Sequence, residues 1–246
     1  MSKGFRNKKC VYCNQRDSTR SGDHVFPRRL FLVNRRANLP KVPCCTKCNN
    51  QKSRLEANLL AILPFGANHS DALENLTTNV PKRLKKNIKL YRELRDSMSK
   101  AFIKNEAGIL EPMMIIEFDI NQLFDLFNYI TRALVHLHFN TKMTSQHFIK
   151  SFITAPVLNN FFNGSAQERI EQDLGNGTVW YRGIQAKENQ SLTLWEYKIY
   201  GGLQLLDQLS GNINSYTCRN EIQHKIDLRT KFDIKVDQAL IRQLYE

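Results

Sequence analysis

Two Cys-x-x-Cys pairs lie in the first fifty residues, and they restrict the fold of this chain more than any other feature. The pairs are Cys10–Cys13 and Cys45–Cys48. Because two thiolates three positions apart can hold one ion from a tight turn, four of them can complete a tetrahedral zinc site. Such a closed site is structural, and its apparent binding free energy, on the order of 10 kcal/mol, stabilises the fold. We therefore predict a Zn²⁺ site within residues 10–60, with Cys44 as a spare thiol. The alternative is a set of buried free thiols.

The length and composition are typical of a globular protein with a hydrophobic core of its own. Of the 246 residues, 41% are hydrophobic and 24% are charged, so zinc is not the only source of stability. The longest apolar runs, such as residues 59–63, are much shorter than the roughly 20 residues of a membrane span. The first six residues lack the apolar region of a secretory signal. We expect a cytoplasmic protein without membrane association, whose cysteines bind metal rather than form disulfides.

Positive charge is concentrated in two segments of the chain. The formal net charge is +13, and residues 1–60 hold fourteen Lys or Arg against three acidic residues. Residues 82–100 add eight basic residues against two acidic ones, so the remainder of the chain is acidic. Focused positive charge of this kind is typical of a protein that binds a polyanion. We expect DNA as the partner, with RNA not excluded. The alternative is a basic surface that only keeps the chain soluble.

A second group of polar residues lies between and just after the cysteine pairs. Asp23 and His24 stand between the pairs, and Asn49 follows the last cysteine. Carboxylate and amide oxygens suit Mg²⁺ or Mn²⁺ better than zinc. A neutral imidazole, with an ordinary pKa of about 6.5, can take a proton from water. Neighbours on a strand point to opposite faces, so Asp23 and His24 can serve one phosphate only where the strand bends or ends.

These residues, in this order, resemble the HNH endonuclease family, whose nuclease core is the ββα-metal fold. The resemblance covers about residues 8–60, and the four cysteines match the zinc-containing subset of the family. Small bacterial and phage-type HNH proteins with an uncharacterised C-terminal region are similar to it. The matching stretches are Cys10 to Cys13, Asp23 to Pro27 and Cys45 to Ser53.

The resemblance implies a role for each matched residue. His24 is the general base, and Asp23 with Asn49 binds the catalytic Mg²⁺ or Mn²⁺. Asn38 is the candidate for the middle Asn of the motif, which steadies the loop that holds the base, although it stands farther from the second cysteine pair than the family spacing. Hydrolysis in the family usually leaves 5′-phosphate and 3′-hydroxyl ends.

Four basic residues flank the predicted catalytic residues and are candidates for contacts to phosphate. Arg28 and Arg29 follow the Asp-His dipeptide, and Lys52 and Arg54 follow Asn49. Lys52 shares a helical face with Asn49, because residues three apart on a helix are neighbours. For each of the four, the alternative is a solvated surface position.

The chain is predicted to be α+β and to divide into three segments. Residues 1–66 form the ββα-metal nuclease module with its zinc site, residues 67–100 a linker and a basic helix, and residues 101–246 an α+β region of unknown role. The predicted elements are helices at 45–63, from Pro81 onward, 121–139, 147–162 and 236–245, with a linker at 67–80, and strands at 112–118, 178–185, 192–200 and within 216–236.

The leading hypothesis is a metal-dependent endonuclease that hydrolyses phosphodiester bonds. One alternative is a zinc-stabilised nucleic-acid-binding module without catalysis, although such a module has no need of an Asp-His pair between its cysteines. Another is the nuclease subunit of a partner-regulated complex, in phage defence or restriction, whose acidic C-terminal region binds a protein partner. That region could also mediate homo-oligomerisation.

Overall fold

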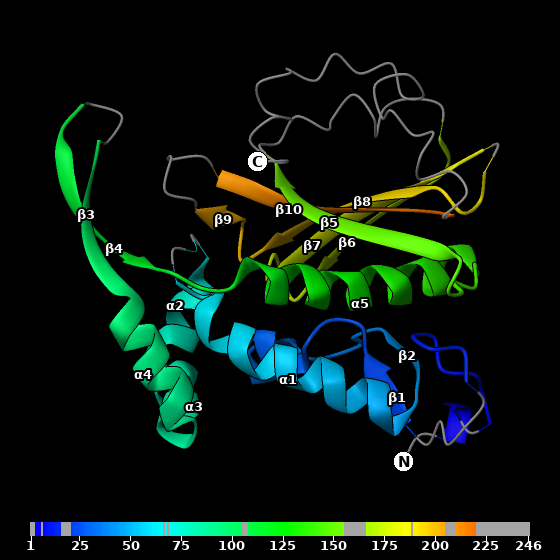
Figure 1. Ribbon diagram of the computed structural model, residues 1–246, viewed down its shortest axis with the longest axis horizontal. Helices are drawn as coiled ribbons and strands as arrows, with labels where there is room; N and C mark the ends of the chain where they lie inside the picture. Colours follow the sequence, from blue (N-terminus) through cyan, green and yellow to red (C-terminus); the bar gives the residue numbers. More distant parts are fainter. Residues whose placement is uncertain are drawn as a thin grey trace.

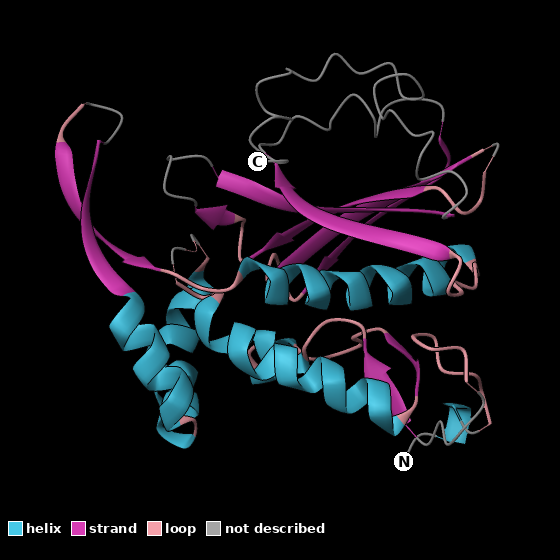
Figure 2. Ribbon diagram, viewed as in Figure 1, coloured by secondary structure: helices cyan, strands magenta, loops and turns pink. Residues whose placement is uncertain are grey.

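A long helix, α5 (Ile120–Phe139), lies between a small N-terminal unit and a large antiparallel sheet (Figure 1). The computed structural model describes residues 3–5, 7–15, 21–65, 67, 69–104, 108–154, 166–187, 189–204 and 210–219. Helices and strands occur in separate runs along the chain rather than in regular alternation (Figure 2), so the predicted α+β class is confirmed. Within the described residues, no helix has both the length and the apolar character needed to cross a membrane.

The N-terminal unit is built from two short strands and one helix. β1 (Ser21–His24) pairs antiparallel with β2 (Lys41–Cys44), so that His24 stands opposite Lys41. α1 (Thr46–Ile62) begins directly after β2, as predicted for residues 45–63. Three 3₁₀ turns complete the unit: η1 (Lys3–Phe5), η2 (Arg28–Leu30) and η3 (Val33–Arg35).

Residues 67–80, predicted to be a linker, are largely helical instead. Two of their polar side chains, Asp71 and Asn75, are buried and make hydrogen bonds inside the fold. Asn75 Nδ2 donates to the carbonyls of Asp71 and Leu30 at 3.0 and 3.1 Å, and Thr178 Oγ1 donates to Asp71 Oδ2 at 2.7 Å. A polar composition therefore does not indicate a free segment here. The helical elements are α2 (Ser70–Glu74), the π-helical turn η4 (Asn75–Asn79), α3 (Val80–Lys86) and α4 (Ile88–Ser97).

The predicted basic helix from Pro81 is present but is divided at Asn87. This residue ends α3 and caps α4, because its Oδ1 accepts a hydrogen bond from the backbone N–H of Leu90 at 3.2 Å. A hairpin of β3 (Met98–Lys104) and β4 (Leu110–Ile116) follows and projects from the body of the molecule (Figure 1). The sequence predicts β4, from residues 112–118, but not β3.

Among the described residues, the large sheet has six antiparallel strands, in the order β5-β10-β8-β7-β6 with β9 beside β10. β7 and β8 confirm the strands predicted at 178–185 and 192–200. The predicted closing helix at 236–245 lies outside the described residues, as do residues 220–235. The strands are β5 (His147–Thr154), β6 (Ala166–Leu174), β7 (Val179–Ala186), β8 (Thr193–Ile199), β9 (Leu203–Gln204) and β10 (Ser210–Arg219).

The helix predicted at 147–162 is wrong over its described part, because residues 147–154 form β5. Both faces of this strand carry apolar side chains. The rings of Phe148 and Phe152 lie 6.1 and 6.2 Å from the ring of Tyr216, whereas Ile149 packs against the main core. When both faces are apolar, the alternation that identifies a strand is lost from the sequence.

One hydrophobic core runs through the N-terminal unit, α5 and the large sheet. The ring of Phe26, just after β1, lies 5.4 Å from the ring of Tyr181 in β7. On α5, the ring of Phe127 lies 4.9 Å from that of Tyr197, and the hydroxyls of Thr131 and Tyr197 are hydrogen-bonded at 2.8 Å. The cysteine-rich unit therefore shares its interior with the region that follows residue 100.

Candidate functional site

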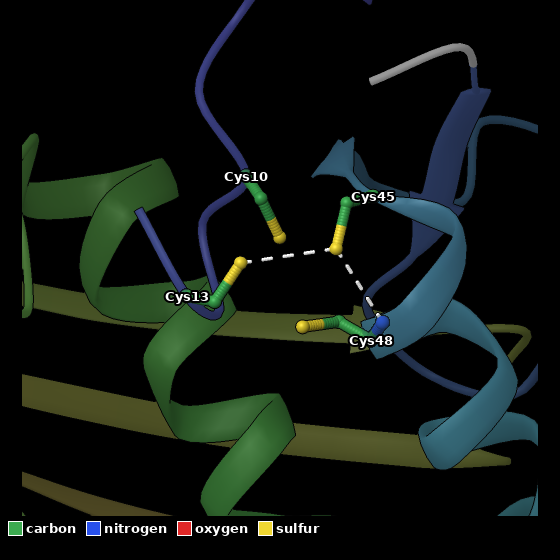
Figure 3. A group of neighbouring side chains, drawn as sticks. All are labelled: Cys10, Cys13, Cys45 and Cys48. Carbon is green, nitrogen blue, oxygen red and sulfur yellow. Dashed lines mark hydrogen bonds between the residues drawn. The ribbon is translucent and has the colours of Figure 1, made fainter. Parts of the chain in front are cut away.

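The four predicted cysteines come together in a single cluster (Figure 3). The sulfurs of Cys10, Cys13, Cys45 and Cys48 all lie within 4.8 Å of one another, and those of Cys13 and Cys45 are 3.8 Å apart. Tetrahedral zinc with Zn–S bonds of about 2.3 Å places its sulfurs about 3.8 Å apart. The cluster could therefore hold a metal ion such as zinc, and the four-thiolate donor set fits that ion.

Local backbone structure places both cysteine pairs. Cys45 is the N-cap of α1, and its Sγ accepts a hydrogen bond from the backbone N–H of Cys48 at 3.4 Å. Cys10 and Cys13 lie in a turn before β1, closed by a hydrogen bond from Asn14 N to Cys10 O at 2.9 Å. Cys44 is outside the cluster, and its thiol donates to Cys45 O at 3.2 Å. The prediction of Cys44 as the spare thiol is confirmed.

Helix α5 supports the turn of the first cysteine pair, a contact that no sequence motif indicates. The rings of Tyr12 and Tyr129 lie 5.0 Å apart, edge to face. Arg132 Nη1 donates to the carbonyls of Tyr12 and Met143 at 3.3 Å each, and Asn14 Nδ2 donates to Met143 O at 2.6 Å. The turn therefore depends on residues more than a hundred positions away (Figure 3, green ribbon).

Lys52 forms the centre of a buried ion cluster beside the end of β1. Its Nζ lies 3.0 Å from Asp23 Oδ2 and 2.9 Å from Glu56 Oε1, and it donates to His24 O at 2.6 Å. An ammonium has three donors, and each has an acceptor here. The Lys52 side chain is fully buried. Its predicted contact with phosphate therefore has no support in this structure, because no part of the side chain reaches the surface.

Tyr12 connects the first cysteine pair to Asp23. Its hydroxyl donates to Asp23 Oδ2 at 2.6 Å, the oxygen that also meets Lys52. Burial, and then the charge of Asp23, raises the pKa of Tyr12 well above its ordinary value. The hydroxyl therefore stays protonated and keeps donating. Sequence reasoning missed both Tyr12 and Glu56, although the spacing of four between Lys52 and Glu56 is a signal for a helical ion pair.

His24 ends β1, which satisfies the condition under which Asp23 and His24 can serve one site. The imidazole is half-buried, and within the described part of the chain its buried Nδ1 has no hydrogen-bond partner. Burial lowers the pKa of His24, the charges of Lys41, Arg28 and Lys52 lower it further, and only Asp23 raises it. The ring is therefore held in the neutral form that can accept a proton.

The other predicted site residues lie around this cluster. Asn49 is partly exposed in the first turn of α1, one helical turn before Lys52. Arg54 is exposed on α1, and Arg28 and Arg29 are exposed on η2. Asn38 is exposed in the turn after η3, where its φ of 55° suits an asparagine. Among the described residues no hydrogen bond joins Asn38 to His24, so its role stays a prediction.

Comparison of the chain with protein-family models, with curated proteins and with solved structures found no match. Its function is therefore inferred from its residues and their geometry.

We predict that zinc is bound by the clustered cysteines and not by Cys44. Purified Cys48→Ser should contain much less zinc than the wild-type chain and should melt at a lower temperature, because removing one thiolate opens the coordination sphere. Cys44→Ser is the matched control, since a hydroxyl can replace its thiol as a donor to Cys45 O. Metal analysis and thermal melts measure both effects. Equal zinc content in the two variants would contradict the assignment.

We also predict that Lys52 supports the fold rather than contacting a ligand. Lys52→Met leaves the carboxylates of Asp23 and Glu56 without their buried partner, so the free energy of unfolding should fall by about 3–5 kcal/mol. Urea denaturation measures the change. Lys47→Met, at an exposed position on the same helix, should change it by less than about 0.5 kcal/mol. Similar unfolding midpoints for the two variants would show that the cluster contributes little.

Proposed function

We propose that this chain is a metal-dependent endonuclease of the HNH type that hydrolyses nucleic-acid phosphodiester bonds, with DNA as the expected substrate. The main observation behind this proposal is that Asp23 and His24 lie at the end of β1. Lys52 of α1 holds this end of the strand through its ion pair with Asp23 and its hydrogen bond to His24 O. The order of β1, β2 and α1 supports the ββα arrangement that the resemblance implies. The cysteine cluster and the first turn of α1, which carries Asn49, lie immediately beyond β2.

Asp23 and Asn49 fit the oxygen-ligand site of a divalent cation. Within the described residues, the two side-chain contacts to Asp23 both use Oδ2, and none uses Oδ1. Asn49 lies one turn before Lys52 on the same face of α1, and Lys52 Nζ lies 3.0 Å from Asp23 Oδ2. The side chains of Asn49 and Asp23 therefore lie on the same side of the N-terminal unit. The carboxylates of Asp23 and Glu56 both contact the Lys52 ammonium in this cluster. When bound, Mg²⁺ or Mn²⁺ supplies polarisation of the phosphate and stabilisation of the leaving oxygen.

His24 fits the role of general base. A buried ring nitrogen without a partner costs about 1–3 kcal/mol, and a water molecule that donates a hydrogen bond to it would satisfy it. The neutral imidazole takes a proton from water while the water oxygen forms a bond to phosphorus and the bond from phosphorus to the 3′ oxygen breaks. The 3′ oxygen then takes a proton from solvent, which leaves 5′-phosphate and 3′-hydroxyl ends.

We predict divalent-dependent cleavage of plasmid or single-stranded DNA that requires His24. His24→Ala should lower the cleavage rate at least about a hundredfold, the usual contribution of a general base, while DNA binding is retained. His136→Ala is the matched control, because this histidine lies on α5 outside the site. Gel assays with added Mg²⁺ or Mn²⁺, and without either, measure the rate.

Two outcomes of this assay would count against the proposal. Unchanged cleavage by His24→Ala would show that another group is the base. Binding without cleavage by the wild-type chain under all metal conditions would favour the alternative of a zinc-stabilised nucleic-acid-binding module.

A further inference from the structure

Four arginines without acidic partners gather beside the proposed catalytic site. Arg28 and Arg29 form part of η2, Arg36 follows η3, and Arg83 comes from α3. Within the described residues, none of the four makes an ion pair with a carboxylate. Arg35 differs, because its Nε lies 3.1 Å from Oδ2 of buried Asp71. Within the described part of the fold, the acidic residue that interacts electrostatically with one of the other four is Glu56: burial raises its pKa, and Arg29 partly opposes that rise without forming an ion pair with it.

Hydrogen bonds to backbone carbonyls bring the four arginines together from distant parts of the chain. Arg83 Nη2 donates to Arg29 O at 2.9 Å, and its Nη1 donates to Leu60 O at 2.7 Å. Arg36 Nε donates to Phe31 O at 3.0 Å. Carbonyl groups fix the position of a guanidinium without cancelling its charge. Helix α3 thus contributes to a surface that begins only a few residues after β1.

The four arginines lie close enough together for their charges to affect one another's pKa. Burial is the largest cause of the lowered pKa of Arg36, and the charges of Arg28 and Arg29 lower it further. Burial also lowers the pKa of Arg83 most, with Arg29 and Arg36 adding to the effect against the opposing influence of Tyr200. An arginine remains charged despite such shifts. The like charges therefore stand close together, and the fold bears the cost of that repulsion.

The backbone beneath the cluster is held rigidly. The carbonyl of Leu30, at the end of η2, accepts hydrogen bonds from Tyr200 Oη at 2.6 Å and from Asn75 Nδ2 at 3.1 Å. All three of these residues are buried. These hydrogen bonds attach the end of η2, which carries Arg28 and Arg29, to the core. A fixed group of like charges is preorganised for a ligand of opposite charge.

We infer that Arg28, Arg29, Arg36 and Arg83 form one surface that binds the nucleic-acid backbone next to the phosphodiester bond addressed by His24. This inference rests on the proposed function. The surface lies beside the base, because η2 begins four residues after His24, the last residue of β1. Guanidinium groups match phosphate oxygens in geometry and charge. Successive phosphates of one strand can meet several arginines, whereas their position beside a hydrolytic site disfavours an acidic protein as the ligand.

The test measures DNA binding by the full chain carrying His24→Ala, so that cleavage does not interfere. Fluorescence anisotropy of a labelled duplex is followed across a series of NaCl concentrations. Adding Arg28→Gln or Arg36→Gln should weaken binding several-fold at low salt. Each should also make the slope of log Kd against log salt shallower by about 0.9, the effect of losing one phosphate contact. Arg169→Gln, an exposed arginine on β6 paired with Glu171, is the matched control and should bind like the parent.

Several results would overturn this inference. Parent-like affinity and salt slope for both Arg28→Gln and Arg36→Gln would do so, as would an equal loss in Arg169→Gln. Thermal melts of every variant exclude misfolding as the cause of a loss. If the parent binds polyglutamate but not the duplex, the surface serves an acidic protein instead.

The failure of this surface can be distinguished from the failure of the proposed function. If the wild-type chain never cleaves DNA but arginine-dependent binding persists, the endonuclease is refuted and the surface stands. If the wild-type chain cleaves DNA and the arginine variants bind and cleave normally, the surface is refuted and the endonuclease stands.

Discussion

The buried ammonium of Lys52 is the interaction on which the geometry of the N-terminal unit depends. Removing a charge from water costs several kcal/mol unless well-placed partners compensate. Here the three acceptors come from the end of β1 and from α1, which joins groups 28 residues apart in the chain. If either element shifts, the ammonium loses a partner in a place that water does not reach. The positions of Asp23 and His24 are therefore fixed by the need to satisfy Lys52.

The cysteine cluster and the proposed catalytic residues form one connected structure. Tyr12 lies between Cys10 and Cys13, and its hydroxyl donates a hydrogen bond to Asp23. A change in the backbone turn of the first cysteine pair would therefore displace the partner of the Asp23 carboxylate. Helix α5 supports the same turn through Tyr129 and Arg132. The region after residue 100 thus supports the proposed site. Its helix α5 packs beside the turn of Cys10 and Cys13 (Figure 1), and Tyr12 in this turn donates a hydrogen bond to Asp23.

Features encoded by spacing could be predicted from the sequence. The cysteine cluster follows from two Cys-x-x-Cys pairs, and α5 follows from its regular apolar positions. The hairpin of β7 and β8 follows from two strand-like runs around a short polar loop.

Features created by tertiary packing could not be predicted in this way. Lysines are almost never fully buried, so the sequence predicts Lys52 at the surface. The fold buries it because the carboxylates of Asp23 and Glu56 lie where they can pair with its ammonium. Polar residues such as Asn75 are typical of a linker, and only their buried partners make this segment part of the fold. The four arginines are separated by up to 55 residues in the sequence, and only the contact of Arg83 with Arg29 O brings α3 to η2. Asn38 illustrates the opposite case, since the family pattern assigns it a role that no described contact supports.

The central claim is that Asp23 holds a divalent cation beside His24. Titration of the zinc-loaded chain with Mn²⁺, followed by electron paramagnetic resonance, tests it most directly, because free and bound Mn²⁺ give distinct signals. The account predicts one bound Mn²⁺ per chain, lost in Asp23→Asn while the zinc content stays close to that of the wild type. Because Asp23→Asn also removes a charged partner of Lys52 and should lower the melting temperature, binding is measured well below the melting transition of both chains. Equal Mn²⁺ binding by Asp23→Asn and the wild-type chain, or no binding by either, would contradict it.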